Sequence, residues 1–248
     1  MPNLNRLRQN GASSLTAQTV EMPAATLIAH ASMLSGMTPD LHGIYWNEHA
    51  PDLGKVRGPT VFSVAHDAGK RTAMIVGKVK LDHINLPNSV DYWYVGDSDL
   101  DVKNHAVNMI QTEPELPNVF FIHFPDVDWQ GHKTGWESDE QNAVISRTDG
   151  YVDDIVQALN AKGYLETTLI IVTSDHGGHE MSHYSDSPED RTIPWLAIGP
   201  GVPRGVPLER PINIQDTAPT VLSALNLTPP PPWNGQVITE IFNGRASP

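Results

Sequence analysis

The chain has 248 residues, 39% of them hydrophobic, which is enough to bury the core of one large α/β domain or two small ones. Its 29 acidic and 16 basic residues give a formal charge of −13, which argues against a general binder of nucleic acid or of anionic membranes. The chain has no cysteine, so disulfides and thiolate ligands are excluded, and any metal site must use Asp, Glu and the 11 His residues.

The sequence also lacks the marks of a membrane protein. No apolar stretch reaches the roughly 18 residues that a membrane-spanning helix needs. The segment after Met1 does not resemble a signal peptide. We therefore expect a soluble protein without a membrane span. Composition indicates neither the compartment nor the oligomeric state, since a chain without cysteine suits oxidising and reducing surroundings alike.

Two helices are predicted near the start of the chain. Residues 3–10 form a short amphipathic pattern that ends at Gly11, and residues 26–34 form a pattern of small residues with Gly36 near its end. Thr26 then lies close to the N-terminus of the second helix, where free N–H groups and the helix dipole favour an anion. Two interpretations remain open: a threonine that merely caps the helix, or a hydroxyl nucleophile whose attacked phosphate is held by the same amides.

From residue 38 to residue 124 the predicted helices and strands alternate. The pattern predicts a turn and a short extended piece over 38–47, helices over 59–69 and 99–113, and strands over 72–76, 90–95 and 118–124. The last strand runs into residues 125–135, which we interpret as a loop. Asp128 and His132 lie four residues apart in it, and Asp126 is a rival ligand. This spacing is compatible with a metal site or with a solvated acidic loop.

The chain is organised around residues 168–178. A β-branched apolar run predicts a buried central strand that is parallel to its neighbours. The run ends in Ser174-Asp-His-Gly-Gly178, so Asp175 and His176 are expected at the carboxyl edge of the sheet, where ligands of open α/β sheets collect. Both side chains are suitable ligands for zinc. The alternative is an Asp that caps the following turn and a His that packs.

The remaining elements complete the alternation. We predict the longest helix over 138–162, a strand over 193–198, a helix over 213–225, and an irregular tail from the four prolines at 229–232. His179 and His183 lie in the polar segment that follows the organising strand. Strands and helices that alternate throughout predict a single domain over residues 1–248, a three-layer α/β/α sandwich with a mostly parallel central sheet.

Six polar residues are expected on one edge of this sheet: Thr26, Asp128, His132, Asp175, His176 and His183. They supply a hydroxyl, two carboxylates and three imidazoles. Two divalent metals roughly 4 Å apart need such a set, because one metal activates the nucleophile while the other stabilises the leaving oxygen. The sequence therefore favours a two-metal site beside a threonine hydroxyl.

These motifs closely resemble the alkaline phosphatase superfamily, and within it the type I phosphodiesterase/nucleotide pyrophosphatase branch. The resemblance covers nearly all of residues 2–225 in the same motif order. It is carried by Thr26-Leu-Ile-Ala-His30 through Pro39-Asp-Leu-His-Gly-Ile44, Asp128-Trp-Gln-Gly-His132, Ser174-Asp-His-Gly-Gly178, and His183 followed by Arg191-Thr-Ile-Pro-Trp195 and Gly199-Pro-Gly201. It implies that the chain has an alkaline phosphatase-like fold and that it hydrolyses a small-molecule phosphate ester.

The resemblance also implies individual roles. Thr26 would be the nucleophile that accepts the phosphoryl group. Asn47 would bind a non-bridging phosphate oxygen with the help of the Leu27 backbone N–H. Three further residues in family-like segments are interpreted as structural: His30, His42 and Lys78.

The resemblance implies two divalent metals as cofactors, and we expect zinc in both sites. The first metal would be bound by Asp128, His132 and His183, with His179 as a rival of His183. The second would be bound by Asp175 and His176 and would also activate Thr26.

Two departures from the family pattern bear on activity. Ala29 stands where the phosphodiesterases usually carry Asn. The family's first strand, whose terminal Asp binds the second metal, would lie immediately before Pro2 and is absent, so we expect a chain truncated at its N-terminus with a weakened second site.

Alternatives therefore remain. One is a catalytically incompetent or weakly active truncated homologue. Another is a phosphomonoesterase or sulfatase of the same superfamily, although the sulfatase motif C/S-x-P-x-R is absent. A phosphomutase would need a cap domain, for which the segment between Asn47 and Phe124 leaves little room.

Overall fold

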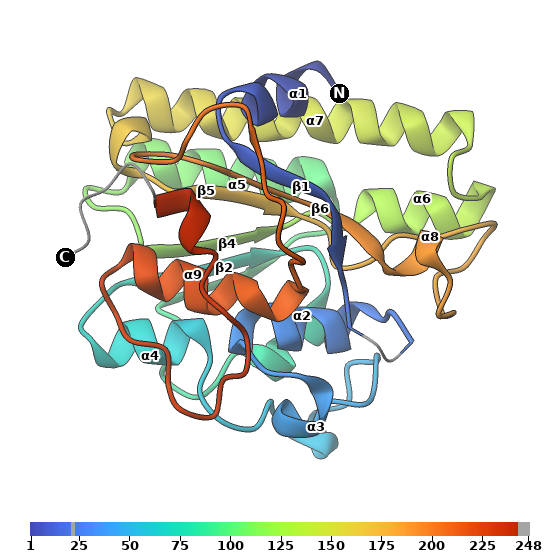
Figure 1. Cartoon of the computed structure of the whole chain (residues 1–248), viewed down its shortest axis with the longest axis horizontal. Coiled ribbons are helices and arrows are strands. Elements are labelled where there is room, and N and C mark those ends of the chain that lie inside the picture. The colour runs from blue at the N-terminus through green and yellow to red at the C-terminus, as the bar shows by residue number, and fades with distance from the viewer. Residues whose placement is uncertain (21–22, 243–248) are drawn as a thin grey trace.

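The computed structural model describes residues 1–20 and 23–242, and Figure 1 shows strands covered by helices on both faces. One face is covered by α1 (Pro2–Gln9), α5 (Asp99–Thr112) and α7 (Asp139–Ala161), and the other by α2 (Thr26–Ser35), α4 (Val61–Asp67) and α9 (Thr217–Ala224). This arrangement confirms the predicted α/β/α sandwich. None of the helices in the described ranges has the length and apolar character needed to cross a membrane.

The strands form two sheets where one was predicted. The first has the order β3 (Tyr92–Val95), β2 (Thr72–Val76), β4 (Val119–His123), and all three strands are parallel. The second has the order β5 (Ile170–Thr173), β6 (Thr192–Ile198), β1 (Ala12–Gln18), β7 (Val206–Pro207), and only β1 and β7 run parallel in it. The predicted parallel character therefore holds for the first sheet, while the second is mixed.

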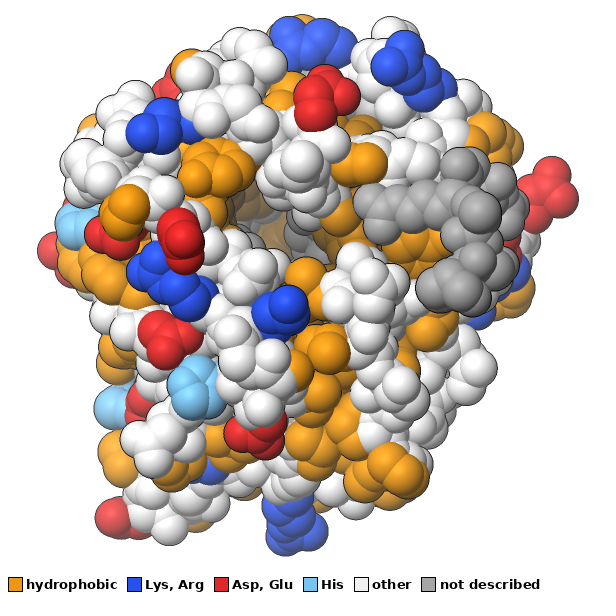
Figure 2. Space-filling model, turned by 90° about the vertical axis from the view of Figure 1, so that its left-hand side faces the viewer, with side chains coloured by type: hydrophobic (Ala, Val, Ile, Leu, Met, Phe, Trp, Pro, Cys, Tyr) orange, Lys and Arg blue, Asp and Glu red, His pale blue; other side chains and the backbone are white. Residues whose placement is uncertain are grey.

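Strands β4 and β5 are edges of the two different sheets. Each pairs with one neighbour within the described chain, yet Phe120 of β4 and Ile170 of β5 pack into one hydrophobic cluster with residues of α5 and α7. Every residue of β5 remains partly exposed, whereas every residue of β2 is buried. Figure 2 shows a deep hollow in one face of the molecule, bordered mainly by hydrophobic and uncharged side chains.

The predicted strand at 168–173 exists, but the prediction that it is buried, central and parallel to its neighbours is wrong. The strand exists as β5, but it lies at a sheet edge and is antiparallel to β6. An apolar β-branched run identifies a strand that has two apolar faces, but it does not specify the neighbours that pair with it.

Strand β1 occupies a segment for which the sequence pattern predicts no element. Small residues of this strand face the core, as Ala12, Ser14 and Ala17 are buried, while Leu15 is 57% exposed. Its pairing with β6 also shifts register between Ser14 and Ala17. The alternation of large apolar and polar residues that marks a strand is therefore missing here.

Residues 126–134 form the helix α6 (Asp126–Thr134), where we predicted a loop. Gly131 is the one residue of this helix that is buried, so there is no apolar stripe to mark it. Asp126 and Asp128 in its first turn complement the positive end of the helix dipole, and Lys133 complements the other end. The helix ends at Gly135, which has a φ of +98°.

Helix α2 is buried on all sides, because all of its residues are buried. It ends at Gly36, which is in the left-handed conformation with a φ of +64°. A Cβ at this position would lie 2.5 Å from the ring of Trp233, so both the backbone and the packing require glycine. The helix that begins at Thr26 is thus fixed firmly in the core.

A buried carboxylate joins α5, α6 and α7. Asp99 accepts a hydrogen bond from the backbone N–H of Asp126 (2.8 Å), and Asp126 accepts one from the backbone N–H of Asp99 (3.2 Å). The hydroxyl of Thr148 in α7 also donates to Asp99 (2.5 Å). Burial raises the pKa of Asp99 to about 6, although the hydrogen bonds from Thr148 and Asp126 partly oppose this rise.

We expect the substitution Asp99→Asn to flatten the dependence of stability on pH. The pKa of Asp99 is higher in the folded chain than its ordinary value of 3.8, so the folded chain binds more protons between pH 4 and 6. Its free energy of unfolding therefore falls as pH rises through this window, by up to about 3 kcal/mol from this group. Urea unfolding at pH 4, 5.5 and 7 should show a smaller fall in Asp99→Asn. The exposed substitution Asp154→Asn should behave like the native chain, and equal slopes in all three would contradict the prediction.

Candidate metal centre and nucleophile

Thr26 is the first residue of α2, and Ala25 is the N-cap of this helix. No side chain caps the helix, so the interpretation of Thr26 as a plain N-cap is wrong. The residue is buried, and its Oγ1 accepts a hydrogen bond from Nζ of Lys78 at 3.2 Å. A hydroxyl beside both a helix N-terminus and an ammonium group lies where negative charge is stabilised.

Asp128 and His132 lie one turn apart on α6, and His183 approaches them from the segment that follows β5. Oδ1 of Asp128 is 3.5 Å from Nε2 of His132 and 3.5 Å from Nε2 of His183. The two Nε2 atoms are 3.1 Å apart. One ligand atom from each of the three residues lies within 4.8 Å of the others, as a shared metal ion would require.

The two imidazoles are oriented by backbone carbonyl groups. Nδ1 of His183 forms a hydrogen bond with the carbonyl oxygen of Ala24, and Nδ1 of His132 forms one with the carbonyl oxygen of Met181 (3.0 Å). These acceptors place the ring proton on Nδ1 and leave the lone pair of each Nε2 directed at Asp128. Burial and the neighbouring His176 lower the pKa of His183 to about 4, so this ring is neutral at neutral pH.

Asp175 and His176 follow the carboxyl end of β5 and lie beside this cluster. The rings of His176 and His183 are stacked with centroids 3.7 Å apart. Nε2 of His176 is 3.4 Å from Oδ2 of Asp175 and 3.7 Å from Oδ1 of Asp128. Nδ1 of His30, in α2, is also 3.4 Å from Oδ2 of Asp175. The six residues predicted from sequence to converge thus lie close together, with Thr26 linked to Asp128 through Lys78.

Both carboxylates have pKa values below the usual value despite their burial. Burial alone would raise the pKa of Asp175, but His176, His30 and Lys78 outweigh it and hold the pKa well below its usual value. Burial likewise opposes ionisation of Asp128, but Lys78 and His176 bring its pKa below the usual value. The site therefore presents anionic oxygens at neutral pH.

Two buried polar atoms in this cluster have no hydrogen-bond partner among the described residues: Oδ1 of Asp128 and Nε2 of His176. Buried polar atoms are nearly always paired, so such atoms indicate a missing partner. An anionic oxygen and an imidazole nitrogen are both ligands of borderline divalent cations. The donor set therefore fits the divalent cation that the sequence predicts.

Lys78 lies inside the site, although we interpreted it from sequence as structural. Its Nζ donates to Oδ2 of Asp128 (2.6 Å) as well as to Thr26. Its position after β2, at the carboxyl end of a parallel strand, is the signal that could have identified it. His42 agrees with its structural interpretation, since it is buried and bonded to Ser32 (3.0 Å).

Asn47 is held next to the start of α2. Its Oδ1 accepts hydrogen bonds from the backbone N–H of Leu27 (3.0 Å) and from Nζ of Lys80 (2.9 Å). Its Nδ2 donates to the hydroxyl of Tyr184 (3.3 Å). The Leu27 N–H, expected to bind phosphate, instead binds Asn47. Lys80 lies in the same contact network, and no motif in the sequence distinguishes it from a surface lysine.

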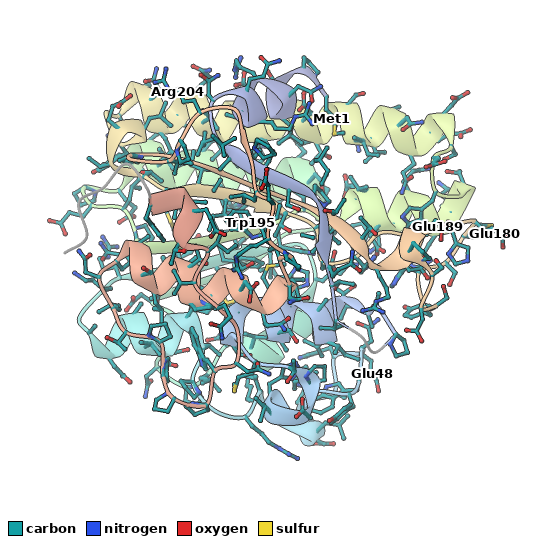
Figure 3. All side chains as sticks on the ribbon, in the orientation of Figure 1. Met1, Glu48, Glu180, Glu189, Trp195 and Arg204 are labelled. Atoms are coloured by element: carbon teal, nitrogen blue, oxygen red, sulfur yellow. The ribbon has the colours of Figure 1, made fainter. Side chains whose placement is uncertain are left out.

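The two rival ligands point elsewhere. Asp126 pairs with Arg147 (3.2 Å) and with the backbone of Asp99. His179 is bonded through Nδ1 to the buried Asp190 (2.7 Å). Glu180 and Glu189 flank the segment that contains His183, and Glu48 follows Asn47 in the chain. Figure 3 shows these three glutamates on the same side of the molecule.

A cleft of about 460 Å³ lies beside Thr26 and the cluster of Asp128, His132 and His183. Charged and imidazole groups line its interior, and two partly exposed aromatic side chains, Trp129 and Tyr184, lie on its wall. Thr26, Lys78 and Lys80 all contribute to the lining. The cleft thus combines a hydroxyl, two ammonium groups and the cluster around Asp128, which suits an anionic ester.

Solved structures with an alkaline phosphatase-like fold match the fold of this chain. Human ectonucleotide pyrophosphatase/phosphodiesterase 5 matches with a TM-score of 0.82 at 15% identity, over 99% of this chain and 94% of that chain. The murine protein, solved as an inactive T72A variant in complex with AMP, matches with a TM-score of 0.81 at 15% identity, over 98% and 94%. A 2-O GAG sulfatase, BT1596, matches with a TM-score of 0.74 at 15% identity, over 99% and 70%.

The model of the family described as type I phosphodiesterase/nucleotide pyrophosphatase matches residues 1–197. The chain therefore belongs to this family. Among curated proteins it is also similar to arylsulfatase K of Danio rerio, 36% identical over 85 residues, and of Mus musculus, 30% identical over 111 residues. These matches cover 32% and 42% of this chain but span 16% and 20% of the length of those relatives.

Proposed function

We propose that this chain is a metal-dependent hydrolase of small-molecule phosphate esters, with a phosphodiesterase/nucleotide pyrophosphatase-like activity that passes through a phospho-threonine. One observation carries the proposal. The hydroxyl of Thr26, free of any capping role, lies at the N-terminus of α2 and shares Lys78 with the Asp128 carboxylate of the metal-ligand cluster. Family membership supports the reaction class.

The metal ligands follow from the same cluster. We assign Asp128, His132 and His183 to the first metal and Asp175 and His176 to the second, with zinc as the proposed ion because all donors are nitrogen or oxygen. Divalent ions bound there would lower the pKa of the nucleophile and neutralise charge on the leaving oxygen. The second set has one carboxylate and one imidazole, so we expect it to bind its ion more weakly than the first.

In the first half-reaction, Oγ1 of Thr26 loses its proton and forms a bond to phosphorus, while the bond from phosphorus to the ester oxygen breaks; the released alcohol or phosphate takes up the proton. In the second, water attacks the phospho-threonine, frees Thr26 and releases the phosphate product. Lys78 and the N-terminus of α2 stabilise negative charge near Thr26 throughout. Nδ2 of Asn47 is the donor we assign to a non-bridging phosphate oxygen.

Three chromogenic substrates test this function: bis-p-nitrophenyl phosphate, p-nitrophenyl phosphate and p-nitrophenyl sulfate, each with and without added Zn²⁺ or Mn²⁺. We expect metal-dependent release of nitrophenol from the phosphates, fastest from the diester. Hydrolysis of the monoester in preference to the diester would assign a phosphomonoesterase. No hydrolysis of any ester with either metal would contradict the proposal and identify a catalytically incompetent homologue.

A sulfatase is the second candidate. It is favoured by the similarity to arylsulfatase K and by the match to a 2-O GAG sulfatase structure. Release of nitrophenol from the sulfate ester, at a rate equal to or above that from the phosphates, would establish it. Thr26 in place of the Cys or Ser of the sulfatase motif favours phosphate.

A further inference from the structure

Lys80 is a half-buried cation that the proposed chemistry does not yet use. It lies in the short helix η2 (Val79–Ile84) that follows β2, and its side chain lines the cleft. Its Nζ is 2.9 Å from Oδ1 of Asn47, and no other hydrogen bond of this group occurs in the described residues. Lys78, two residues earlier, contacts Thr26 and Asp128 instead, so the two lysines serve different parts of the cleft.

The amide of Asn47 can be placed in two ways, and its surroundings select one. Two donors, the N–H of Leu27 and the ammonium of Lys80, converge on one end of the amide. Only the amide oxygen can accept from them, so the opposite end must be the NH₂ group. That group faces the hydroxyl of Tyr184, which itself lines the cleft. Without the Lys80 donor, the Leu27 N–H alone would hold this orientation.

We infer that Lys80 is a positioning residue that fixes the side-chain amide of Asn47 with its NH₂ group toward the cleft, where it donates to an anionic oxygen of the substrate. This inference rests on the proposed function for the identity of the substrate oxygen, but the orientation of Asn47 does not depend on it. A charged donor serves this purpose well, since hydrogen bonds from ammonium groups are about twice as strong as neutral ones.

The charge of Lys80 adds a pH signature. Burial and the neighbouring Lys78 lower the pKa of Lys80 to about 8, while Asp128, Asp175 and Glu48 partly oppose this. His49 also lines the cleft on this side. As pH rises through about 8 the ammonium loses its proton and the bond to Asn47 weakens. An alkaline decline in kcat/KM near this pH is therefore expected for the native chain, and it should move to higher pH in Lys80→Arg.

The first test measures Asn47 directly and needs no catalysis. The chain is labelled with ¹⁵N-asparagine, and the side-chain NH₂ signal of Asn47 is assigned by its loss in Asn47→Ala. We expect Lys80→Met to shift this signal toward the values of exposed amides and to accelerate its exchange with solvent, and Lys80→Arg to restore it. The control Lys55→Met removes a lysine that pairs with Asp82 at 2.5 Å and should leave the signal unchanged. An Asn47 signal identical in the native chain and Lys80→Met would overturn the inference.

The second test measures function. We expect Lys80→Met to lower kcat/KM for the phosphate ester about 10- to 100-fold, with Lys80→Arg within a few-fold of the native chain. In the Asn47→Ala background the same substitution should change kcat/KM less than about 3-fold, because the group that Lys80 positions is gone. An equal loss in both backgrounds would show that Lys80 does not act through Asn47. A native chain that hydrolyses no ester would contradict the proposed function, while the signal of Asn47 would still decide the role of Lys80.

Discussion

Replacing Thr26 by alanine is expected to abolish ester hydrolysis, with a loss in kcat of at least about 10³-fold. The hydroxyl is the group we assign to attack phosphorus, and its removal leaves no other hydroxyl at the start of α2, because the next side chains are Leu27 and Ile28. The fold should be unaffected, since Thr26 makes no capping hydrogen bond. Steady-state hydrolysis of bis-p-nitrophenyl phosphate measures the loss, and circular dichroism checks the fold.

Two further variants sharpen this test. Thr26→Ser keeps a hydroxyl and should retain a measurable rate. Thr112→Ala removes a hydroxyl that bonds only within α5 and should have the activity of the native chain. Metal bound to the cluster of Asp128, His132 and His183 should be retained in Thr26→Ala. Near-native turnover in this variant would exclude Thr26 as the nucleophile.

The substitution Asp128→Asn is expected to remove the first metal and, with it, activity. Oδ1 of Asp128 lies within 3.5 Å of Nε2 of His132 and of His183, and it accepts no hydrogen bond in the described part of the chain. An amide has no charge to attract the cation, so metal affinity should fall by more than about 100-fold, beyond the range typical for loss of a supporting residue. Competition with a chromophoric chelator measures the affinity for Zn²⁺.

The matched control is Asp126→Asn, two residues earlier on the same helix. Asp126 forms an ion pair with Arg147 and accepts a hydrogen bond from the backbone N–H of Asp99, and it does not contact the imidazoles of His132 and His183. Its substitution should leave the affinity for Zn²⁺ within about 3-fold of the native value, although stability can fall through the lost ion pair. The reverse ranking, with metal lost in Asp126→Asn and kept in Asp128→Asn, would show that the wrong carboxylate was chosen.

Most of the fold could be predicted from the sequence wherever an element has a periodic apolar pattern. The stripe that includes Val144 and Leu159 marks α7, and the apolar run at 72–76 marks β2. The pattern failed where small or polar residues do the packing, as in β1 and α6. It also could not specify strand neighbours, because pairing depends on residues far apart in sequence: β5 lies against β6, and β6 against β1.

The proximity of the candidate site residues could be predicted better than the elements that carry them. A spacing of four brings Asp128 and His132 together in the helix α6 as well as in the predicted loop, because residues four apart lie on one helical face. Asp175 and His176 come together with them because β5, which precedes these two residues, ends on the same side as β4, which precedes α6. Lys78 and Lys80 could not be distinguished from ordinary surface lysines, as only the fold shows that their ammonium groups face Thr26 and Asn47.

Strands β4 and β5 belong to different sheets and do not pair with each other, which we expect to affect the behaviour of the chain in solution. Each of these strands directs one row of backbone amide and carbonyl groups away from its only partner in the described sheets. A further strand, from the same polypeptide or from another copy of it, can pair with such a row. We therefore expect self-association that increases with protein concentration, measurable by sedimentation velocity over a tenfold range. A monomer at every concentration would mean that the flanking helices shield these rows from other chains.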